Sequence, residues 1–212
     1  MIALTISDIM DADNAILRIS DLLKRKTSVE IPNALCIRND SFSPDTFAEM
    51  TQLVCTLWDG DVILESVDPS SLTKAAIHTI GRNTTLIGAN SGNLDEFIMV
   101  ARMFNCSLCV SDENIETLFD IAKTAKDSGI GTIFVDPMMR NMKQCLERCT
   151  DIKRIKEIIP DLDFKIAVRS WSGEYAMTMA TVSLMVDDAL VIVDDLDWDS
   201  CYTLSALLSS IR

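Results

Sequence analysis

The stretch "TTLIGANSGNLDEFIMVARMF", residues 84–104, contains one complete structural repeat of this chain. It begins with an apolar run around Leu86 and Ile87, passes through the polar residues 90–93, and continues with apolar residues at helical spacing. This order predicts a β-strand, a short polar loop at its carboxyl end, and an α-helix. Such a strand–helix unit is the building block of a parallel sheet that is covered by helices.

The same unit recurs along the whole chain. Eight apolar runs of strand length can be read from the sequence: residues 2–8, 34–40, 61–68, 84–90, 107–112, 132–137, 164–170 and 189–195. A segment with the apolar spacing of an amphipathic helix follows each run. Ser43 and Pro44 supply a helix start signal, and Gly81 and Gly129 supply stop signals. Eight units with no strand left over predict a closed (β/α)8 TIM barrel in a single domain, residues 1–212, and an open doubly wound sheet is the alternative.

The charge of the chain limits its partners. The formal net charge is −13 at pH 7, whereas binding to nucleic acid or to an anionic membrane surface requires a surplus of Lys and Arg. The apolar runs are too short to span a membrane, and the N-terminus lacks the basic flank of a signal peptide. We therefore expect a cytoplasmic protein whose partners are neutral or cationic molecules or other proteins.

The seven cysteines include two pairs with suggestive spacing. Cys106 and Cys109 form a CxxC motif, but it falls in a predicted strand, where residues three apart face opposite sides of the sheet. Cys145 and Cys149 lie four residues apart on a predicted helix, where two thiols without a further ligand make an incomplete zinc site. We expect all the cysteines to be reduced, and no metal to be held by this chain.

Polar side chains gather at the carboxyl ends of the predicted strands, the face that carries the active site in barrels of this kind. Three that close apolar strands are the main candidates for ligand contacts: Glu65, Asn90 and Asp136. Helix capping is the competing interpretation, because Asp, Asn and Ser are the residues that helix N-termini select. Three further polar residues are assigned to capping alone: Ser70, Asp95 and Asn114.

Several types of chemistry lack the residues that they need. The only histidine, His78, falls within the third predicted helix, which excludes histidine-based metal hydrolysis and Ser-His-Asp catalysis. No glycine-rich phosphate loop is present. Carboxylates and amides can instead hold a heterocycle through its ring N–H and exocyclic amine groups, a pattern that suits a pterin. A magnesium ion is a further alternative, held by Asp8, Asp40, Asp194 and Asp195.

Six segments, in the same order along the chain, carry a resemblance to a known family: "IALTISDIMD", "ALCIRNDSFSPDTFAEM", "VILESVDPSSLTKAA", "FNCSLCVS", "IFVDPMMRNMKQCLERCTDIKRI" and "DDALVIVDDLDWDSCYTLSALLSSIR". Together they resemble the barrel domain of the large (gamma) subunit of the corrinoid iron–sulfur protein, part of the CO dehydrogenase/acetyl-CoA synthase (acetyl-CoA decarbonylase/synthase) system of anaerobes. That family implies a barrel related to pterin-binding methyltransferases. Its large subunit also has a four-cysteine cluster motif and a corrinoid-binding domain. Because these 212 residues contain neither, we expect no cofactor to be tightly bound to this chain.

The wider superfamily, which includes dihydropteroate synthases and methyltetrahydrofolate:corrinoid methyltransferases, implies roles for particular positions. Asn90, in "IGANSGN", is similar to the pterin-contacting amide that ends the fourth strand. Asp136, in "IFVDP", is similar to the pterin-contacting aspartate, and the third-strand carboxylate corresponds to Glu65 or Asp68. Ser170 stands where the methyltransferases have an asparagine, a departure that bears on how the transferred N-methyl group is polarised.

The resemblance implies a stand-alone barrel in corrinoid-dependent one-carbon transfer. The barrel would bind a methyl-tetrahydropterin as substrate, and a separate corrinoid protein would dock over its mouth and take the methyl group. The alternative is a non-catalytic module that docks a corrinoid protein or a methyltransferase subunit, so methyltransferase activity is left open; a homodimer is compatible with both. Substrate contacts are expected from Glu65, Asp68, Asn90, Asp136 and Ser170, and additional contacts at the mouth from Asp8, Asn39, Ser91 and Arg169.

Overall fold

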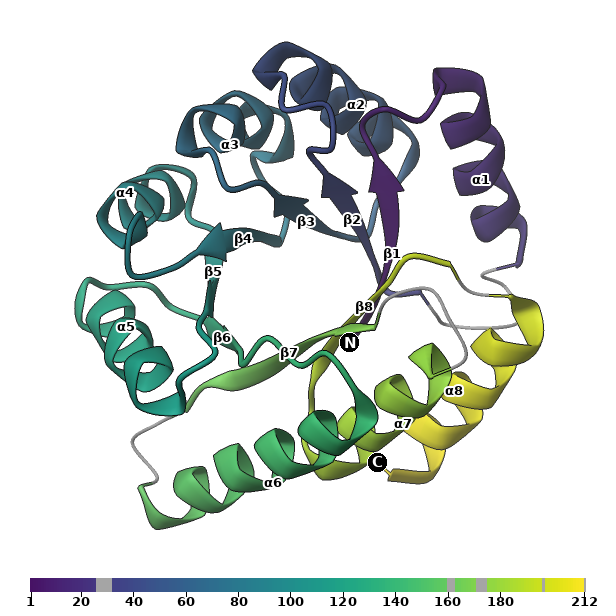
Figure 1. Ribbon diagram of the computed structural model, residues 1–212. Helices are drawn as coiled ribbons and strands as arrows, with labels where there is room; N and C mark the ends of the chain where they lie inside the picture. The colour runs from purple at the N-terminus through teal and green to yellow at the C-terminus, as the bar shows by residue number, and fades with distance from the viewer. Residues whose placement is uncertain (26–31, 160–162, 171–174, 196, 212) are drawn as a thin grey trace.

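The strand-length runs of the sequence form eight parallel strands: β1 (Ile2–Ser7), β2 (Ala34–Arg38), β3 (Asp61–Glu65), β4 (Thr84–Ala89), β5 (Ser107–Ser111), β6 (Ile133–Asp136), β7 (Lys165–Ser170) and β8 (Leu190–Val193). Each strand pairs with the next, and β1 also pairs with β8, so the sheet closes into a barrel (Figure 1). The computed structural model describes residues 1–25, 32–159, 163–170, 175–195 and 197–211. The predicted closed (β/α)8 barrel is therefore confirmed, and an open sheet is excluded.

Helices follow the strands and surround the barrel (Figure 1). They are α1 (Ala12–Arg25), α2 (Pro44–Leu57), α3 (Pro69–Ala76), α4 (Leu94–Phe104), α5 (Ile115–Asp127), α6 (Met142–Ile158), α7 (Ala176–Val186) and α8 (Trp198–Ile211). His78 lies in a short 3-10 helix, η1 (Ile77–Thr79), that continues α3. Within the described ranges, none of the helices combines the length and apolar character that crossing a membrane requires.

Several helix boundaries lie where the sequence signals predict them. Ser43 caps α2 by accepting a hydrogen bond from the Thr46 N–H, and Pro44 occupies the first helical position. Asn114 caps α5 in the same way. Gly81 and Gly129 follow η1 and α5 with φ angles of 85° and 91°, the left-handed conformation that glycine adopts most readily where a helix ends.

Two predicted caps are wrong, and a residue nearer to the preceding strand explains each. Asp68 caps α3, because its carboxylate accepts from the backbone N–H groups of Ser70 and Ser71. Ser70 itself only donates its hydroxyl to Asp68. Asn93 occupies the N-cap position of α4, and Asp95 lies in the first turn, where a negative charge faces the positive end of the helix dipole.

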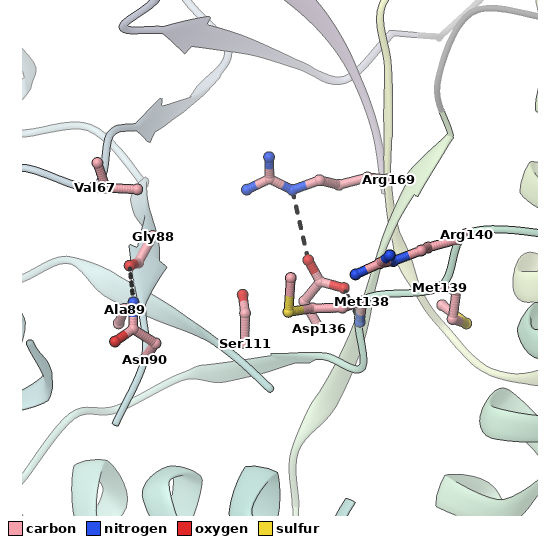
Figure 2. A pocket seen from close by; sticks show the side chains of 10 residues that line it. All are labelled: Val67, Gly88, Ala89, Asn90, Ser111, Asp136, Met138, Met139, Arg140 and Arg169. Carbon is pink, nitrogen blue, oxygen red and sulfur yellow. Dashed lines mark hydrogen bonds and ion pairs between the residues drawn. The ribbon is translucent and has the colours of Figure 1, made fainter. Parts of the chain in front are cut away.

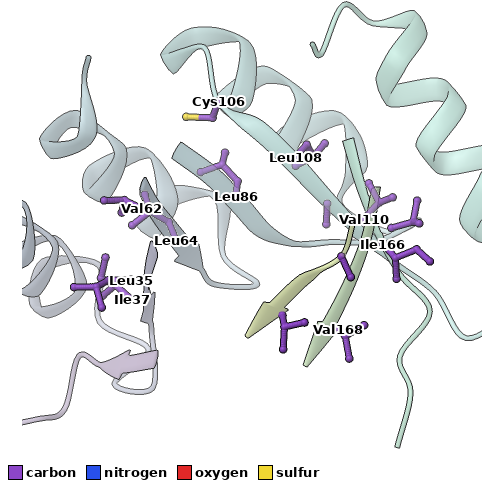
Figure 3. Close-up of a cluster of buried hydrophobic side chains, with 14 of the residues drawn as sticks. Leu35, Ile37, Val62, Leu64, Leu86, Cys106, Leu108, Val110, Ile166 and Val168 are labelled. Atoms are coloured by element: carbon purple, nitrogen blue, oxygen red, sulfur yellow. The ribbon is translucent and has the colours of Figure 1, made fainter. Parts of the chain in front are cut away.

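Two apolar layers hold the barrel together, one on each face of the strands. The outer layer packs strand residues such as Leu64, Leu86 and Val110 beneath the helices (Figure 3). The inner layer fills the barrel with residues from alternate strand positions: Ala3, Ala34, Cys36, Ile63, Ile87, Cys109, Phe134, Ala167, Leu190 and Ile192. Side-chain alternation also separates the CxxC pair as predicted, since Cys106 lies in the outer layer and Cys109 in the inner layer.

All seven cysteines are free thiols. Cys145 and Cys149 lie fully buried on α6, where they pack against the Met179 carbonyl and the Met139 sulfur. Among the residues that the structure describes, no three His, Cys, Asp or Glu side chains are grouped as a metal site. Cys106, Cys109, Cys145 and Cys149 therefore act as small residues of the apolar core.

Candidate functional site

The mouth of the barrel, formed by the carboxyl ends of its strands, becomes polar because of side-chain alternation. Three of the residues in the inner layer lie on β3, β6 and β7: Ile63, Phe134 and Ala167. A residue two positions further along a strand points to the same side. On the same three strands those residues are charged: Glu65, Asp136 and Arg169. On these three strands, the side chains that face the barrel interior thus change from apolar to charged over two residues.

Arg169 bridges the two carboxylates. Its Nη1 donates a hydrogen bond to Glu65 Oε1, and its Nε lies 3.5 Å from Asp136 Oδ2. Glu65 is held from below as well, because the Cys36 thiol lies 3.5 Å from Oε2. Residues from β3, β6 and β7 are thereby joined into one ionic cluster, in which Asp136 is only 5% exposed and Glu65 and Arg169 are half-buried.

One donor of this cluster is left without an acceptor. The Arg169 Nε–H is buried and makes no hydrogen bond with any atom of the described residues, because Asp136 Oδ2 lies beyond a good hydrogen-bond distance. Buried polar groups in native proteins are almost always hydrogen-bonded. Each exception of this kind calls for an explanation, and a ligand atom that accepts the hydrogen bond is one.

Burial and the neighbouring charges both shift the pKa values of Asp136 and Arg169. Burial raises the pKa of Asp136, the nearby Glu65 carboxylate raises it further, and Arg169 and the Met138 N–H oppose the shift. For Arg169, burial disfavours the charged form, yet the carboxylates of Glu65 and Asp136 together raise its pKa. The guanidinium is therefore a permanent cation at the centre of the cluster.

A pocket of about 350 Å³ opens beside the cluster (Figure 2), a volume within the usual range for small-molecule sites. Its polar groups are contributed by Asn90, Ser111, Asp136, Arg140 and Arg169. The remaining lining residues are apolar or small: Val67, Gly88, Ala89, Met138 and Met139. A polar end beside an apolar wall suits a flat heterocycle with a hydrogen-bonding edge.

The loop between β6 and α6 shapes one side of the pocket. Asp136 Oδ1 accepts a hydrogen bond from the Met138 N–H at 2.8 Å, and Met138 adopts a left-handed φ of 52°. Met139 is turned inward, with its sulfur 3.8 Å from the Cys149 thiol. Arg140 then reaches the rim of the pocket and pairs with Glu113. A bulky residue with positive φ is rare, so this loop conformation is tightly constrained.

Asn90 lines the opposite side of the pocket, but its amide is engaged locally. Its Oδ1 accepts from the Gly92 N–H at 2.8 Å, and its Nδ2 lies 3.5 Å from the Gly88 carbonyl. The side chain therefore forms a turn within its own loop. Each of these contacts uses only part of the amide, so one Nδ2 hydrogen and one Oδ1 lone pair remain for a ligand.

Most of the other predicted site residues stabilise the loops around the mouth. Asp68 caps α3 and is not among the lining residues. Asp8 is buried and accepts hydrogen bonds from the N–H groups of Asp40 and Ser41. Asn39 is buried and donates to the Ser66 hydroxyl.

Three further predicted positions neither line the pocket nor are described as stabilising a loop at the mouth. Glu65 contacts Arg169 beneath the pocket and does not line it. Ser91 is exposed in the loop before α4. Ser170 ends β7, and its side chain lies outside what the structure describes.

The alternative magnesium site does not form as proposed. Arg38 lies between two of the four carboxylates, with its Nη1 2.8 Å from Asp194 Oδ1 and its Nε 2.9 Å from Asp40 Oδ1. Asp8 faces backbone N–H groups, and Asp195 pairs with Arg18. A guanidinium thus supplies the positive charge at the place that the alternative assigned to a magnesium ion.

The sequence interpretation missed the loop that follows β6. Met138, Met139 and Arg140 all line the pocket, yet none of them was a candidate. Their position directly after the strand-end aspartate, in "IFVDPMMR", was the available signal, because loops of this kind form the active face of a barrel.

The burial of Asp136 predicts a pH dependence of stability. Its pKa in the folded chain lies above the ordinary value of 3.8, so between these two values the folded chain holds a proton that the unfolded chain releases. This contribution to stability is present below the ordinary pKa and is lost as the pH rises through the raised pKa. Relative to Asp136→Asn, the free energy of unfolding of the wild type should therefore fall across that window, by at most about 1.4 kcal/mol per pH unit.

Urea denaturation of both proteins at a series of pH values measures this difference. The variant serves as the reference because its asparagine does not titrate. A wild type that gains stability relative to the variant as the pH rises would show that Arg169 outweighs burial and lowers the pKa.

Comparisons with known proteins agree with this architecture. The chain is 25% identical over 122 residues to the corrinoid/iron–sulfur protein large subunit of Moorella thermoacetica. It is 26% identical over 172 residues to the acetyl-CoA decarbonylase/synthase complex subunit gamma of Methanothermobacter thermautotrophicus. The matches cover 58% and 78% of this chain but only 27% and 36% of those relatives. They bear out the resemblance that the six sequence segments carry.

Solved structures of dihydropteroate synthases have the same fold. The enzyme of Thermus thermophilus in complex with 6HMPPP aligns with a TM-score of 0.73 and 12% identity, covering 100% of this chain and 94% of that one. The Yersinia pestis enzyme in complex with a sulfonamide drug aligns with a TM-score of 0.71 and 10% identity, covering 100% and 93%. At such low identity the likeness concerns the fold alone.

The model of one family extends over nearly the whole sequence. It describes the CO dehydrogenase/acetyl-CoA synthase delta subunit and matches residues 1–202, a range that includes all eight strands and every residue of the pocket. The chain therefore belongs to the CO dehydrogenase/acetyl-CoA synthase delta subunit family.

Proposed function

We propose that the pocket binds the pterin ring of a methyl-tetrahydropterin and that the barrel serves corrinoid-dependent methyl transfer. Membership of the delta subunit family and a relative named as a corrinoid/iron–sulfur protein support the methyl-transfer context. The fold shared with dihydropteroate synthases supports a pterin as the ligand. The pocket itself supplies the chemical argument.

The observation that carries the proposal is the position of Asp136 beside the Arg169 Nε–H, which has no hydrogen-bond acceptor among the described residues. A pterin presents an exocyclic amine and a ring N–H next to a carbonyl oxygen, which makes two donors followed by one acceptor. The Asp136 carboxylate offers two acceptor oxygens, and the Arg169 Nε–H offers one donor 3.5 Å from Oδ2. Binding would thus give the Arg169 Nε–H the acceptor that it lacks among the described residues.

The remaining residues then act by positioning. Glu65 holds Arg169 in place from beneath, a role that replaces the direct contact expected from the sequence. Val67 and Met138 offer apolar contacts to the ring face, and Asn90 can donate through its Nδ2. Little covalent chemistry is asked of the barrel, because positioning and fixed charges can supply most of the rate enhancement when the geometry is tight.

A partner protein would supply the corrinoid, because a relative of this chain is named as a corrinoid/iron–sulfur protein. The loops that follow β1, β2 and β3 each expose one large apolar side chain: Ile9, Phe42 and Val67, at 67%, 78% and 66% exposure. Phe42 also holds a left-handed φ of 55°, a strain that a partner contact would explain. A docking partner over the mouth suits both the catalytic function and the non-catalytic alternative.

Binding of the pterin distinguishes the two functions. Calorimetry with a methyl-tetrahydropterin under anaerobic conditions should give a dissociation constant between about 1 µM and 1 mM, the usual range of enzyme substrates. Absence of binding at about 1 mM, together with a stable complex with a corrinoid protein in gel filtration, would replace the catalytic proposal with the docking module.

A further inference from the structure

A second arginine stands at the outer rim of the pocket. Among the described residues that line the pocket, the positively charged side chains are those of Arg140 and Arg169. Arg169 is surrounded by two carboxylates, whereas the Arg140 side chain is 72% exposed and pairs with Glu113, which is itself 53% exposed. Arg140 is therefore the cation that the pocket offers toward solvent, in a chain whose net charge is −13.

The backbone holds Arg140 at this position. Met138 has a left-handed φ two residues before Arg140, and Asp136 Oδ1 holds this turn by accepting the Met138 N–H. One residue further on, the Arg140 N–H donates to Gln144 Oε1 at 2.9 Å. In Figure 2 the Arg140 side chain lies on the side of the pocket that Asp136 occupies.

We propose that Arg140 binds an anionic group, a carboxylate or a phosphate, on the tail of the ligand whose ring is held at Asp136. This inference rests on the proposed function and adds a second binding group to the same site. An exposed ion pair such as Arg140–Glu113 contributes little free energy, so a ligand anion can displace Glu113. A guanidinium binds carboxylate and phosphate with two parallel hydrogen bonds. With Asp136 at the inner end and Arg140 at the rim, the ligand lies with its ring inward and its charged tail toward solvent.

Two probes separate the tail from the ring. One is 5-methyltetrahydrofolate with its glutamate tail, and the other is 6-methyltetrahydropterin, which has no charged tail. The wild type should bind the tailed probe about three- to tenfold more tightly, the range between an exposed ion pair and a charge-assisted hydrogen bond. Arg140→Gln should abolish this preference, because it should lower the affinity for 5-methyltetrahydrofolate more than the affinity for 6-methyltetrahydropterin.

Glu113→Gln gives the decisive comparison, because it should shift the preference in the opposite direction. Without its competing carboxylate, Arg140 is free for the tail, and the preference for 5-methyltetrahydrofolate should increase. If Arg140 and Glu113 serve only to hold the loop, both variants should weaken both probes alike, and the inference is overturned. Added salt should reduce the preference for 5-methyltetrahydrofolate in the wild type and in Glu113→Gln, because salt screens the attraction between Arg140 and the tail. A preference that salt leaves unchanged would also contradict the role proposed for Arg140.

The two proposals fail in different ways. If neither probe binds the wild type, the proposed function is wrong. If both probes bind with equal affinity, the pterin site stands and the role of Arg140 is wrong. Circular dichroism of the two variants confirms that the barrel is folded in each measurement.

Discussion

Replacing Asp136 with asparagine is expected to weaken methyl-tetrahydropterin binding by about five- to a hundredfold, or about 1–3 kcal/mol. The carboxylate offers two acceptor oxygens to the donor edge of the ring, whereas an amide places an N–H where an acceptor is needed. Because Asp136 is 5% exposed, water cannot easily relieve the mismatch. The substitution also removes a negative charge near Arg169 Nε, which should leave the carbonyl side of the ring less well oriented.

Asp68→Asn is the matched control for this experiment. Asp68 also follows a strand at the mouth and was an equal candidate for the third-strand carboxylate, but it caps α3. Asparagine is as good an N-cap as aspartate, so the fold should tolerate the change. Calorimetry should show unchanged pterin affinity for Asp68→Asn. If Asp68→Asn weakens binding and Asp136→Asn does not, the ligand contacts have been assigned to the wrong strand.

The fold could be predicted because its signals are local and repeat eight times. Each predicted strand was found, and the carboxyl-terminal boundary of most lay one to three residues too far along the chain. The residues that were wrongly included in the predicted strands, such as Asp8, Asn39 and Asp68, belong to the loops that follow the strands. The carboxylates of Asp8 and Asp68 accept hydrogen bonds from backbone N–H groups, and the Asn39 amide donates to the Ser66 hydroxyl. Such loop-stabilising roles are hard to distinguish by sequence from a ligand contact.

The site was predictable only where one strand determines the position of a side chain. Asp136 lines the pocket because it lies two residues beyond Phe134, which faces the barrel interior. The pairing of Glu65 with Arg169 joins residues 104 positions apart in the sequence, so no local pattern could reveal it. Arg140 depends on a positive φ at Met138, and methionine gives no sequence signal for such a turn.

Gly88 links the fold to the site, and Gly88→Ala is expected to destabilise the chain by about 3–5 kcal/mol. Its φ of 127° is rarely adopted by residues with a side chain, and an added Cβ would lie 2.0 Å from the Ser66 carbonyl oxygen. Strained backbone costs about 1–3 kcal/mol, and overpacking adds a similar amount. The β4–β5 register shifts at this point, and Asn90 and the pocket wall follow directly, so pterin affinity should fall together with stability.

Alanine variants of two other glycines separate the backbone strain from the clash with Ser66. Urea denaturation measures the free energy of unfolding of all three variants. Gly81 has a φ of 85° with no atom within 4 Å of an added Cβ, so Gly81→Ala should show the backbone cost alone, about 1 kcal/mol. Gly131 has neither a positive φ nor a close neighbour, and Gly131→Ala should stay within about 0.5 kcal/mol of the wild type. A Gly88→Ala loss no larger than that of Gly81→Ala would mean that Ser66 can move away. The close approach of β4 to the end of β3 would then not be what fixes this wall of the pocket.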